Sequence, residues 1–285
     1  MTQMNDRQVE RGSSRPTRIN TLAVPGARLY YEVRGSGPVL LLIPGGGMDA
    51  DSFAGMASHL ADRYTVVTYD PRDRSRSSII GAAEEDWRAD IHSDDASHLL
   101  AALSQGPVLV FGSSGGAQVG LDLAVRHPDK VGTLVAHEPP AIELLPDAAV
   151  YRALCQEVYD TYLRDGVGPA MAKFLVGFGL EGPPPNAAPP QGEPHPGMAG
   201  IEIFLAHGVR QISAYVPDVA ALRAGSTRVV VAVGDTSRGQ LAPRCGVALA
   251  ERLGTTVRYF PGDHGGYATH PDAFAETLHQ VLSGR

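Results

Sequence analysis

The chain has 285 residues, enough for one large α/β domain or two small ones. Hydrophobic residues make up 43% and charged residues 19%, so a sizeable core can be buried. The formal net charge is −7 and the 24 Lys and Arg residues are scattered, which argues against a nucleic-acid-binding surface.

The N-terminal segment, residues 1–18, is polar and lacks the apolar stretch of a signal peptide. No apolar run approaches the roughly 20 residues that span a bilayer. Cys155 and Cys245 have neither metal-ligand nor redox spacing, so nothing demands an oxidising compartment. We therefore expect a disordered tail up to residue 18 and a cytoplasmic protein without membrane contact.

Short β-rich runs then alternate with helical stretches, the pattern of a mostly parallel sheet with helices on both faces. An early hairpin is expected at 22–24 and 29–33, joined through Pro25 and Gly26. Six further strands complete a predicted eight-stranded sheet, at 39–43, 65–69, 108–111, 131–136, 229–233 and 257–260. Helices are predicted at 52–62, 86–103, 115–127, 241–253 and 272–282.

The loop after the strand at 39–43 reads Pro44, Gly45, Gly46, Gly47. It resembles the glycine motif that lends a backbone N–H to an oxyanion hole, and its glycines let the backbone approach a substrate oxygen closely. Proline replaces the customary histidine and leaves the N–H of Gly46 untouched. Gly46 is therefore a candidate oxyanion donor; a merely flexible loop is the alternative.

Residues Gly112, Ser113, Ser114, Gly115 and Gly116 match the G-x-S-x-G nucleophile elbow, with an apolar strand before and an amphipathic helix after. The glycines are needed because side chains there would collide with neighbouring backbone. The helix N-terminus favours developing negative charge, which makes Gly115 a second oxyanion donor. The glycine spacing selects Ser114 over Ser113 as nucleophile. A glycine-rich turn at the start of an ordinary helix is the alternative.

Residues 142–225 interrupt the alternation, with helical stretches, no good strand and a Pro/Gly-rich run at 182–197. Such an excursion inside a compact domain is usually functional. We predict a helical lid or cap at 142–225, inserted between the sixth and seventh strands of a core formed by 19–141 and 226–285. A surface excursion without a catalytic role is the alternative.

His264 lies in a glycine-flanked loop after the last strand and before the last helix. An imidazole can take a proton from a hydroxyl and return it to a leaving group near neutral pH. We therefore predict His264 as the general base.

The order and spacing of these motifs resemble the α/β-hydrolase superfamily over nearly all of the chain after residue 20. The run at 70–77 is similar to the family's D-x-R-G-x-G-x-S turn, although Asp73 and Ser75 stand where glycines are usual. The resemblance implies a structural role for this turn. A basic substrate-binding patch formed by its arginines is the alternative.

A catalytic triad also needs a carboxylate that orients the imidazole of His264, and two residues are candidates for it. The family usually places it after the seventh strand in a G-x-x-D pattern, but here the third residue after Gly234 is Ser237, and Asp235 is out of register by two. The family's other placement, after the sixth strand, falls at Glu138, followed by two prolines that stiffen the turn. Glu138 is favoured, with Asp235 as the alternative.

These residues imply acyl transfer to water, with Ser114 attacking a carbonyl and water cleaving the acyl-enzyme. We expect a carboxylesterase-like enzyme that cleaves an ester, lactone or thioester of a small, fairly apolar substrate. No metal or organic cofactor is implied, and the oligomeric state stays open. The alternatives are C–C bond hydrolysis, lyase or cofactor-free oxygenase chemistry on the same fold, or a non-catalytic binding protein.

Overall fold

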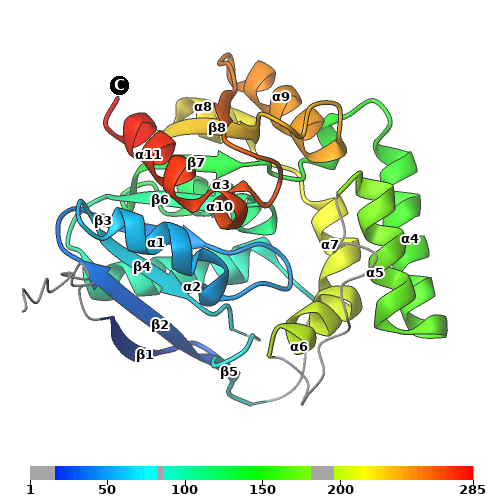
Figure 1. The fold of residues 1–285 in the computed structure, drawn as a ribbon, viewed down its shortest axis with the longest axis horizontal. Helices are drawn as coiled ribbons and strands as arrows, with labels where there is room; N and C mark the ends of the chain where they lie inside the picture. Colours follow the sequence, from blue (N-terminus) through cyan, green and yellow to red (C-terminus); the bar gives the residue numbers. More distant parts are fainter. Residues whose placement is uncertain (1–16, 73, 82–85, 181–195, 285) are drawn as a thin grey trace, which may run out of the picture.

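A computed structural model of the protein describes residues 17–72, 74–81, 86–180 and 196–284. Its strands form one sheet in the order β1-β2-β4-β3-β6-β7-β8-β9, with the short β5 paired to β2 (Figure 1). The strands from β4 to β9 along this order are parallel, and β2 is antiparallel to its neighbours. The strands are β1 (Arg18–Val24), β2 (Ala27–Gly35), β3 (Val39–Ile43), β4 (Thr65–Tyr69), β5 (Ser78–Ile79), β6 (Val108–Ser113), β7 (Val131–His137), β8 (Arg228–Gly234) and β9 (Arg258–Phe260).

The predicted mostly parallel α/β fold is confirmed, and the structure adds β5 to the eight strands expected. The β1–β2 hairpin turns at Gly26, whose φ of 76° favours glycine. One boundary of the predicted tail is wrong: Arg18 begins β1, because it pairs with Val33 of β2. Residues 1–16 of that tail lie outside the described residues.

Side chains of each central strand point alternately to the two faces of the sheet. Leu40 and Leu42 of β3 pack with α1 and α11 on one face, whereas Leu41 and Ile43 pack with α2, α3 and α9 on the other. The core helices are α1 (Ala54–Leu60), α2 (Ala89–Leu103), α3 (Gly115–Arg126), α9 (Leu241–Leu253), α10 (Gly266–Thr269) and α11 (Pro271–Leu282), with the 3-10 turn η1 (Ala50–Phe53) before α1.

A group of helical segments lies between β7 and β8. In this group, α4 (Ala148–Asp165) to α7 (Val209–Ala214) form a separate layer at one side of the sheet, whereas α8 (Val219–Ala224) packs with α3 and α9 of the core (Figure 1). Gln118 of α3 ties this layer to the core, because its Nε2 donates to the carbonyl oxygens of Pro140 and Ile212 at 3.0 and 2.8 Å. Most of the Pro/Gly-rich run at 182–197 lies outside the described residues. The segments are η2 (Ile142–Leu144), α4 (Ala148–Asp165), α5 (Val167–Phe178), α6 (Pro196–Ile203), the π-helical η3 (Phe204–Gly208), α7 (Val209–Ala214) and α8 (Val219–Ala224).

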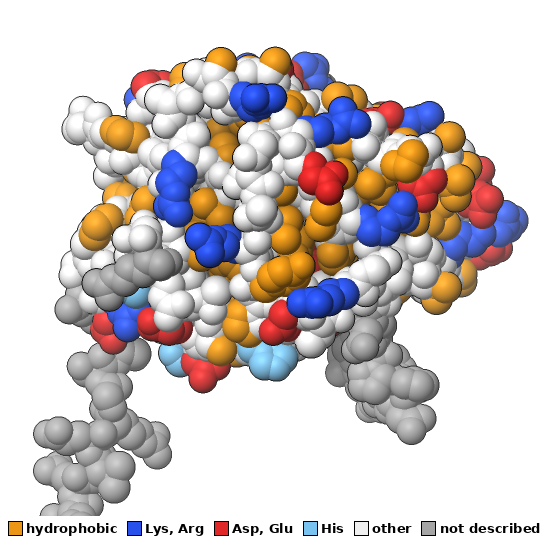
Figure 2. All heavy atoms as spheres, turned by 90° about the horizontal axis from the view of Figure 1, so that it is seen from above, with side chains coloured by type: hydrophobic (Ala, Val, Ile, Leu, Met, Phe, Trp, Pro, Cys, Tyr) orange, Lys and Arg blue, Asp and Glu red, His pale blue; other side chains and the backbone are white. Residues whose placement is uncertain are grey.

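Acidic, basic and hydrophobic side chains are interspersed on the face drawn in Figure 2. No helix in the described ranges combines the length and the apolar composition that a membrane span requires.

Candidate active site

Ser114 occupies a sharp turn between β6 and α3, with φ 55° and ψ −124°. A non-glycine residue rarely adopts positive φ, and such strain clusters at functional sites. The turn closes only with glycines on either side. A Cβ on Gly112 would lie 2.3 Å from the carbonyl oxygen of Gly116, and one on Gly116 would lie 2.2 Å from that of Ile43.

The glycine loop after β3 packs directly against this turn. A Cβ on Gly45 would lie 3.1 Å from Cβ of Ser114, and one on Gly115 would lie 3.4 Å from the backbone nitrogen of Gly46. A Cβ on Gly46 would meet the ring of Phe204 at 2.7 Å. The two predicted oxyanion donors, Gly46 and Gly115, are therefore adjacent, and a π-helical segment of the insertion covers them.

Glu138 follows β7 directly and is completely buried. Its Oε2 lies 2.6 Å from Nδ1 of His264. Its Oε1 accepts hydrogen bonds from the backbone N–H of Gly234, at 2.9 Å, and from the hydroxyl of Ser237. Burial alone would raise the pKa of Glu138, but the hydrogen bond and charge of His264, together with the Ser237 hydroxyl, lower it to about 2. Glu138 is therefore an anion held by three donors.

Asp235, the alternative acid, has a different partner. Its Oδ1 accepts from the backbone N–H of Gly262 at 2.9 Å, and its own N–H donates to the carbonyl of Phe260 at 2.9 Å. Asp235 thus fastens the end of β8 to the loop that carries His264. The structure brings Glu138, and not Asp235, to the imidazole.

The sequence patterns did not reveal the parts that Ser237 and His137 take in this site. Ser237 stands where the family usually has its acid, so the motif gives it no role, yet its buried hydroxyl donates to Glu138. His137 lies in β7 with its Nδ1 3.0 Å from the Ser113 hydroxyl and its ring stacked 6.3 Å from that of His264. Burial lowers the pKa of His137 to about 4. In the sequence, the position of His137 directly before the candidate acid Glu138 could have pointed to a role in this site.

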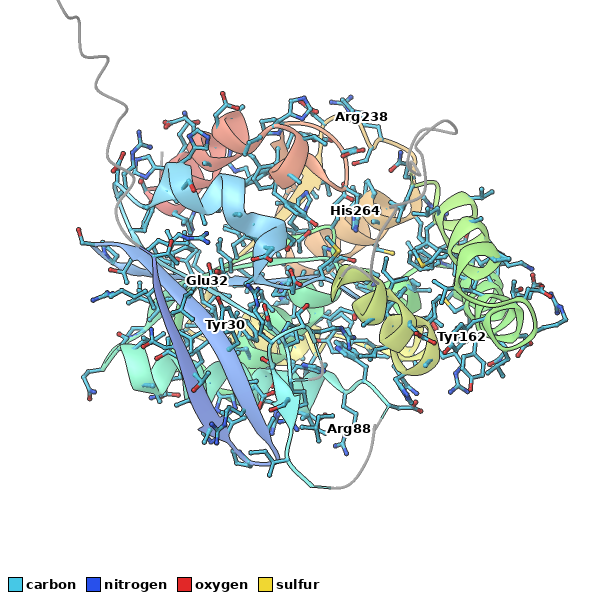
Figure 3. All side chains as sticks on the ribbon, turned by 60° about the horizontal axis from the view of Figure 1, so that its bottom comes forward. Tyr30, Glu32, Arg88, Tyr162, Arg238 and His264 are labelled. Carbon is cyan, nitrogen blue, oxygen red and sulfur yellow. The ribbon has the colours of Figure 1, made fainter. Side chains whose placement is uncertain are left out.

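Ser114 and His264 line the same cavity, of about 210 Å³, which we call the apolar pocket. Figure 3 shows His264 near the junction between the core and the inserted helices. The insertion supplies a largely aliphatic and aromatic wall, which suits an apolar substrate group. The lining residues are Gly45, Gly46, Met48, Ser114, Pro140, Met171, Phe174, Leu175, Phe178, Leu180, Ile201, Phe204, Ile212, Ala242, His264 and Tyr267.

Comparison with known proteins places this chain in a family. A family profile described as "alpha/beta hydrolase fold" matches residues 38–175. The chain is 40% identical over 266 residues to the uncharacterized hydrolase YraK of Bacillus subtilis (strain 168), covering 92% of this chain and 95% of that relative. It is 25% identical over 269 residues to the zearalenone hydrolase of Bionectria ochroleuca, covering 90% and 95%.

Among solved structures, a thermophilic esterase from Thermogutta terrifontis with malate bound has the same fold, with a TM-score of 0.69. It is 21% identical and the match covers 95% of this chain and 99% of that one, a similarity that speaks for the fold alone. The elbow, the mostly parallel sheet and these matches agree. The chain belongs to the α/β-hydrolase family and is a hydrolase of that class.

Proposed function

We propose that the protein is a serine hydrolase that cleaves an ester, lactone or thioester of a small, fairly apolar substrate through an acyl-enzyme. The observation that carries the proposal is the contact between Glu138 and His264, beside a cavity that His264 and Ser114 both line. A buried carboxylate on Nδ1 of a histidine beside an elbow serine is the arrangement of an acyl-transfer triad.

Proton transfer follows from the tautomer that Glu138 selects. The carboxylate accepts a hydrogen bond, so Nδ1 of His264 carries the proton and Nε2 is the free base. Nε2 takes the proton of Ser114 as its Oγ attacks the substrate carbonyl carbon. The imidazolium that forms is stabilised by Glu138, whose lowered pKa keeps it ionised at neutral pH.

The oxyanion that develops on the carbonyl oxygen is held by the backbone N–H groups of Gly46 and Gly115. The N-terminus of α3 adds its dipole to this stabilisation. Collapse of the tetrahedral intermediate expels the alcohol or thiol, which takes the proton from Nε2 of His264. A water molecule then gives a proton to Nε2 and attacks the acyl carbon. As the bond from that carbon to Oγ of Ser114 breaks, Nε2 returns the proton to Oγ, and the carboxylic acid leaves.

A fluorophosphonate probe with intact mass measurement tests this proposal. The parent protein should gain one phosphonyl group on Ser114, Ser114→Ala should gain none, and the matched control Ser113→Ala should still react. Short p-nitrophenyl esters should then give an initial burst of one nitrophenolate per active site when deacylation is slower than acylation.

The same two experiments separate the alternatives. A protein that reacts with the probe but leaves all esters, thioesters and lactones intact would favour C–C hydrolysis or lyase chemistry on the same triad. A folded protein that ignores the probe would favour a non-catalytic binding role. The match to relatives named as hydrolases supports a hydrolytic reaction over lyase chemistry and over a non-catalytic role, and the ester assays separate ester hydrolysis from C–C hydrolysis.

A further inference from the structure

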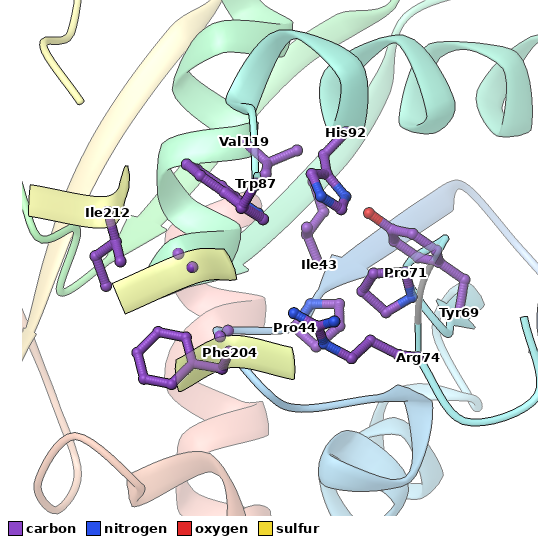
Figure 4. Close-up of a pocket in the computed structure, with 14 residues that line it drawn as sticks. Ile43, Pro44, Tyr69, Pro71, Arg74, Trp87, His92, Val119, Phe204 and Ile212 are labelled. Atoms are coloured by element: carbon purple, nitrogen blue, oxygen red, sulfur yellow. The ribbon is translucent and has the colours of Figure 1, made fainter. Parts of the chain in front are cut away.

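A second cavity, of about 30 Å³, lies beside the apolar pocket and also borders the oxyanion loop, residues 44–47. We call it the small cavity. Among the described residues, Gly45, Gly46, Phe204 and Ile212 line both cavities. Because the two glycines have no side chains, the side chains in the wall between the cavities are those of Phe204 and Ile212. Figure 4 shows both of them at one end of the small cavity.

The ring of Phe204 occupies a space that two glycines leave open. A Cβ on Gly46 would lie 2.7 Å from Cδ2 and Cε2 of the ring, and one on Gly208 would lie 3.0 Å from Cδ2. The ring packs edge-on against that of Phe174, with centroids 5.3 Å apart and an interplanar angle of 78°. Only 5% of Phe204 is exposed, so the ring has little room to move aside. Phe204 is therefore a fixed part of the wall.

The backbone at Phe204 departs from regular α-helical geometry. Its carbonyl accepts a hydrogen bond from the N–H of Val209, five residues further on, which is the bond of a π-helical turn. Such turns are rare and often occur at functional sites. Here the first residue of the turn is the one whose ring lies against Gly46, so the π-helical turn coincides with the contact between the insertion and the oxyanion loop.

The position of this ring gives it a steric role toward a ligand. Gly46 is a proposed oxyanion donor, so a carbonyl oxygen that it holds lies close to the ring of Phe204. The apolar group beside that carbonyl occupies the apolar pocket and meets the wall before it can reach the small cavity. A cavity of about 150 Å³ binds benzene, with its six carbon atoms, so at the same ratio about 210 Å³ admits roughly eight.

We propose that Phe204 determines the size of the substrate that the enzyme accepts. It ends the apolar pocket and limits the apolar group of the substrate to roughly eight carbon atoms. The preferred substrates are then esters, lactones or thioesters with short aliphatic or single-ring groups, and long-chain acyl groups are excluded. This inference rests on the proposed hydrolase function for the word substrate, but the size limit itself does not depend on turnover.

Calorimetric titration of the Ser114→Ala protein with 2-alkanones, from 2-pentanone to 2-dodecanone, tests the inference without catalysis. These neutral ligands carry one carbonyl and differ only in the length of the alkyl chain. Each methylene buried in the pocket should tighten binding about fourfold until the chain meets Phe204, at roughly 2-octanone, and longer chains should gain nothing more. A steady gain through 2-dodecanone would overturn the inference, whether or not any Phe204 variant folds.

Adding Phe204→Ala should let the gain continue for about two to four further carbon atoms, because the change removes the ring and joins the two cavities. Phe204→Leu should give a smaller extension. The matched control Val119→Ala enlarges only the small cavity, which Val119 lines, and should leave the limit unchanged. An unchanged limit in a folded Phe204→Ala protein, or a longer limit in Val119→Ala, would overturn the inference. Labelling of the parent by the fluorophosphonate probe, measured alongside, reports separately on the hydrolase proposal.

Discussion

Replacement of Glu138 by glutamine removes one negative charge while keeping the size of the side chain. The oxygen of the new amide must stay where Oε1 lies, because two donors, the N–H of Gly234 and the hydroxyl of Ser237, face that position. The amide NH₂ then faces Nδ1 of His264 and forces that nitrogen to accept. The proton moves to Nε2, so the imidazole can no longer take the proton of Ser114.

The magnitude follows from the pKa of Glu138, which falls from an ordinary 4.5 to about 2. A difference of roughly 2.5 pKa units corresponds to about 3 kcal/mol in favour of the anion. The part of it that comes from the charge of His264 also stabilises the imidazolium, and its loss costs up to about a hundredfold in kcat. The wrong tautomer adds to this, and the aspartate-to-asparagine change in a Ser-His-Asp protease triad costs about 10⁴ in kcat. We therefore expect the kcat of Glu138→Gln to fall by a factor of about 10²–10⁴.

The assay is the turnover of a short p-nitrophenyl ester at pH 7–8, with circular dichroism as a check on folding. Asp235→Asn is the matched control: it keeps the oxygen that accepts from Gly262 and should lose less than about tenfold. A strong loss of turnover in Asp235→Asn, together with near-normal turnover in Glu138→Gln, would refute the reasoning and identify the residue after β8 as the triad acid.

Three further predictions concern the neighbours of Glu138. Ser114→Ala should lower kcat by about 10³–10⁶ in the same ester assay without changing the melting temperature, whereas Ser113→Ala should keep most of the activity. Ser237→Ala removes one donor to Glu138, so the pKa of this carboxylate should rise and kcat should fall by about three- to thirtyfold, with the loss greatest at the acid end of the kcat profile. The pKa of His137 is about 4 in the fold and 6.5 in the unfolded chain. Between these pH values the unfolded chain binds one more proton than the folded protein, so the free energy of unfolding falls as the pH drops from 6.5 to 4. Replacement of His137 by phenylalanine should reduce that slope by up to about 1.4 kcal/mol per pH unit in urea unfolding, and an unchanged slope would contradict the assignment.

Short sequence patterns predicted most of the fold because most of its strands and turns are determined by residues that are neighbours in the sequence. The apolar runs of β3, β4, β6, β7 and β8 mark strands covered on both faces, and the glycines of the elbow mark the tight turn at Ser114. The two-residue β5 was missed because Ser78 and Ile79 are exposed and carry no periodic pattern.

The candidate site was predicted less fully, because part of it depends on contacts between distant segments. Glu138 and Ser237 are 99 positions apart in the sequence, and their hydrogen bond gives a role to the serine that stands in the usual acid position. The place of Arg74 has the same origin. Three arginines alternate along one turn: Arg72 pairs with Asp95 of α2 and Arg76 with Asp70, whereas Arg74 lines a cavity beside the oxyanion loop.

The sheet explains how an acid can stand after either of two strands and still serve one histidine. β6, β7, β8 and β9 are consecutive neighbours, and the carboxyl ends of parallel strands meet at one edge of a sheet. Ser114 follows β6, Glu138 follows β7, Ser237 follows β8 and His264 follows β9, so all four lie along that edge. The hydrogen bonds from Gly234 and Ser237 to Glu138 join the ends of β7 and β8 directly. A carboxylate from β7 therefore reaches the imidazole across the end of β8 only if β8 presents small donors there, which is what Gly234 and Ser237 provide.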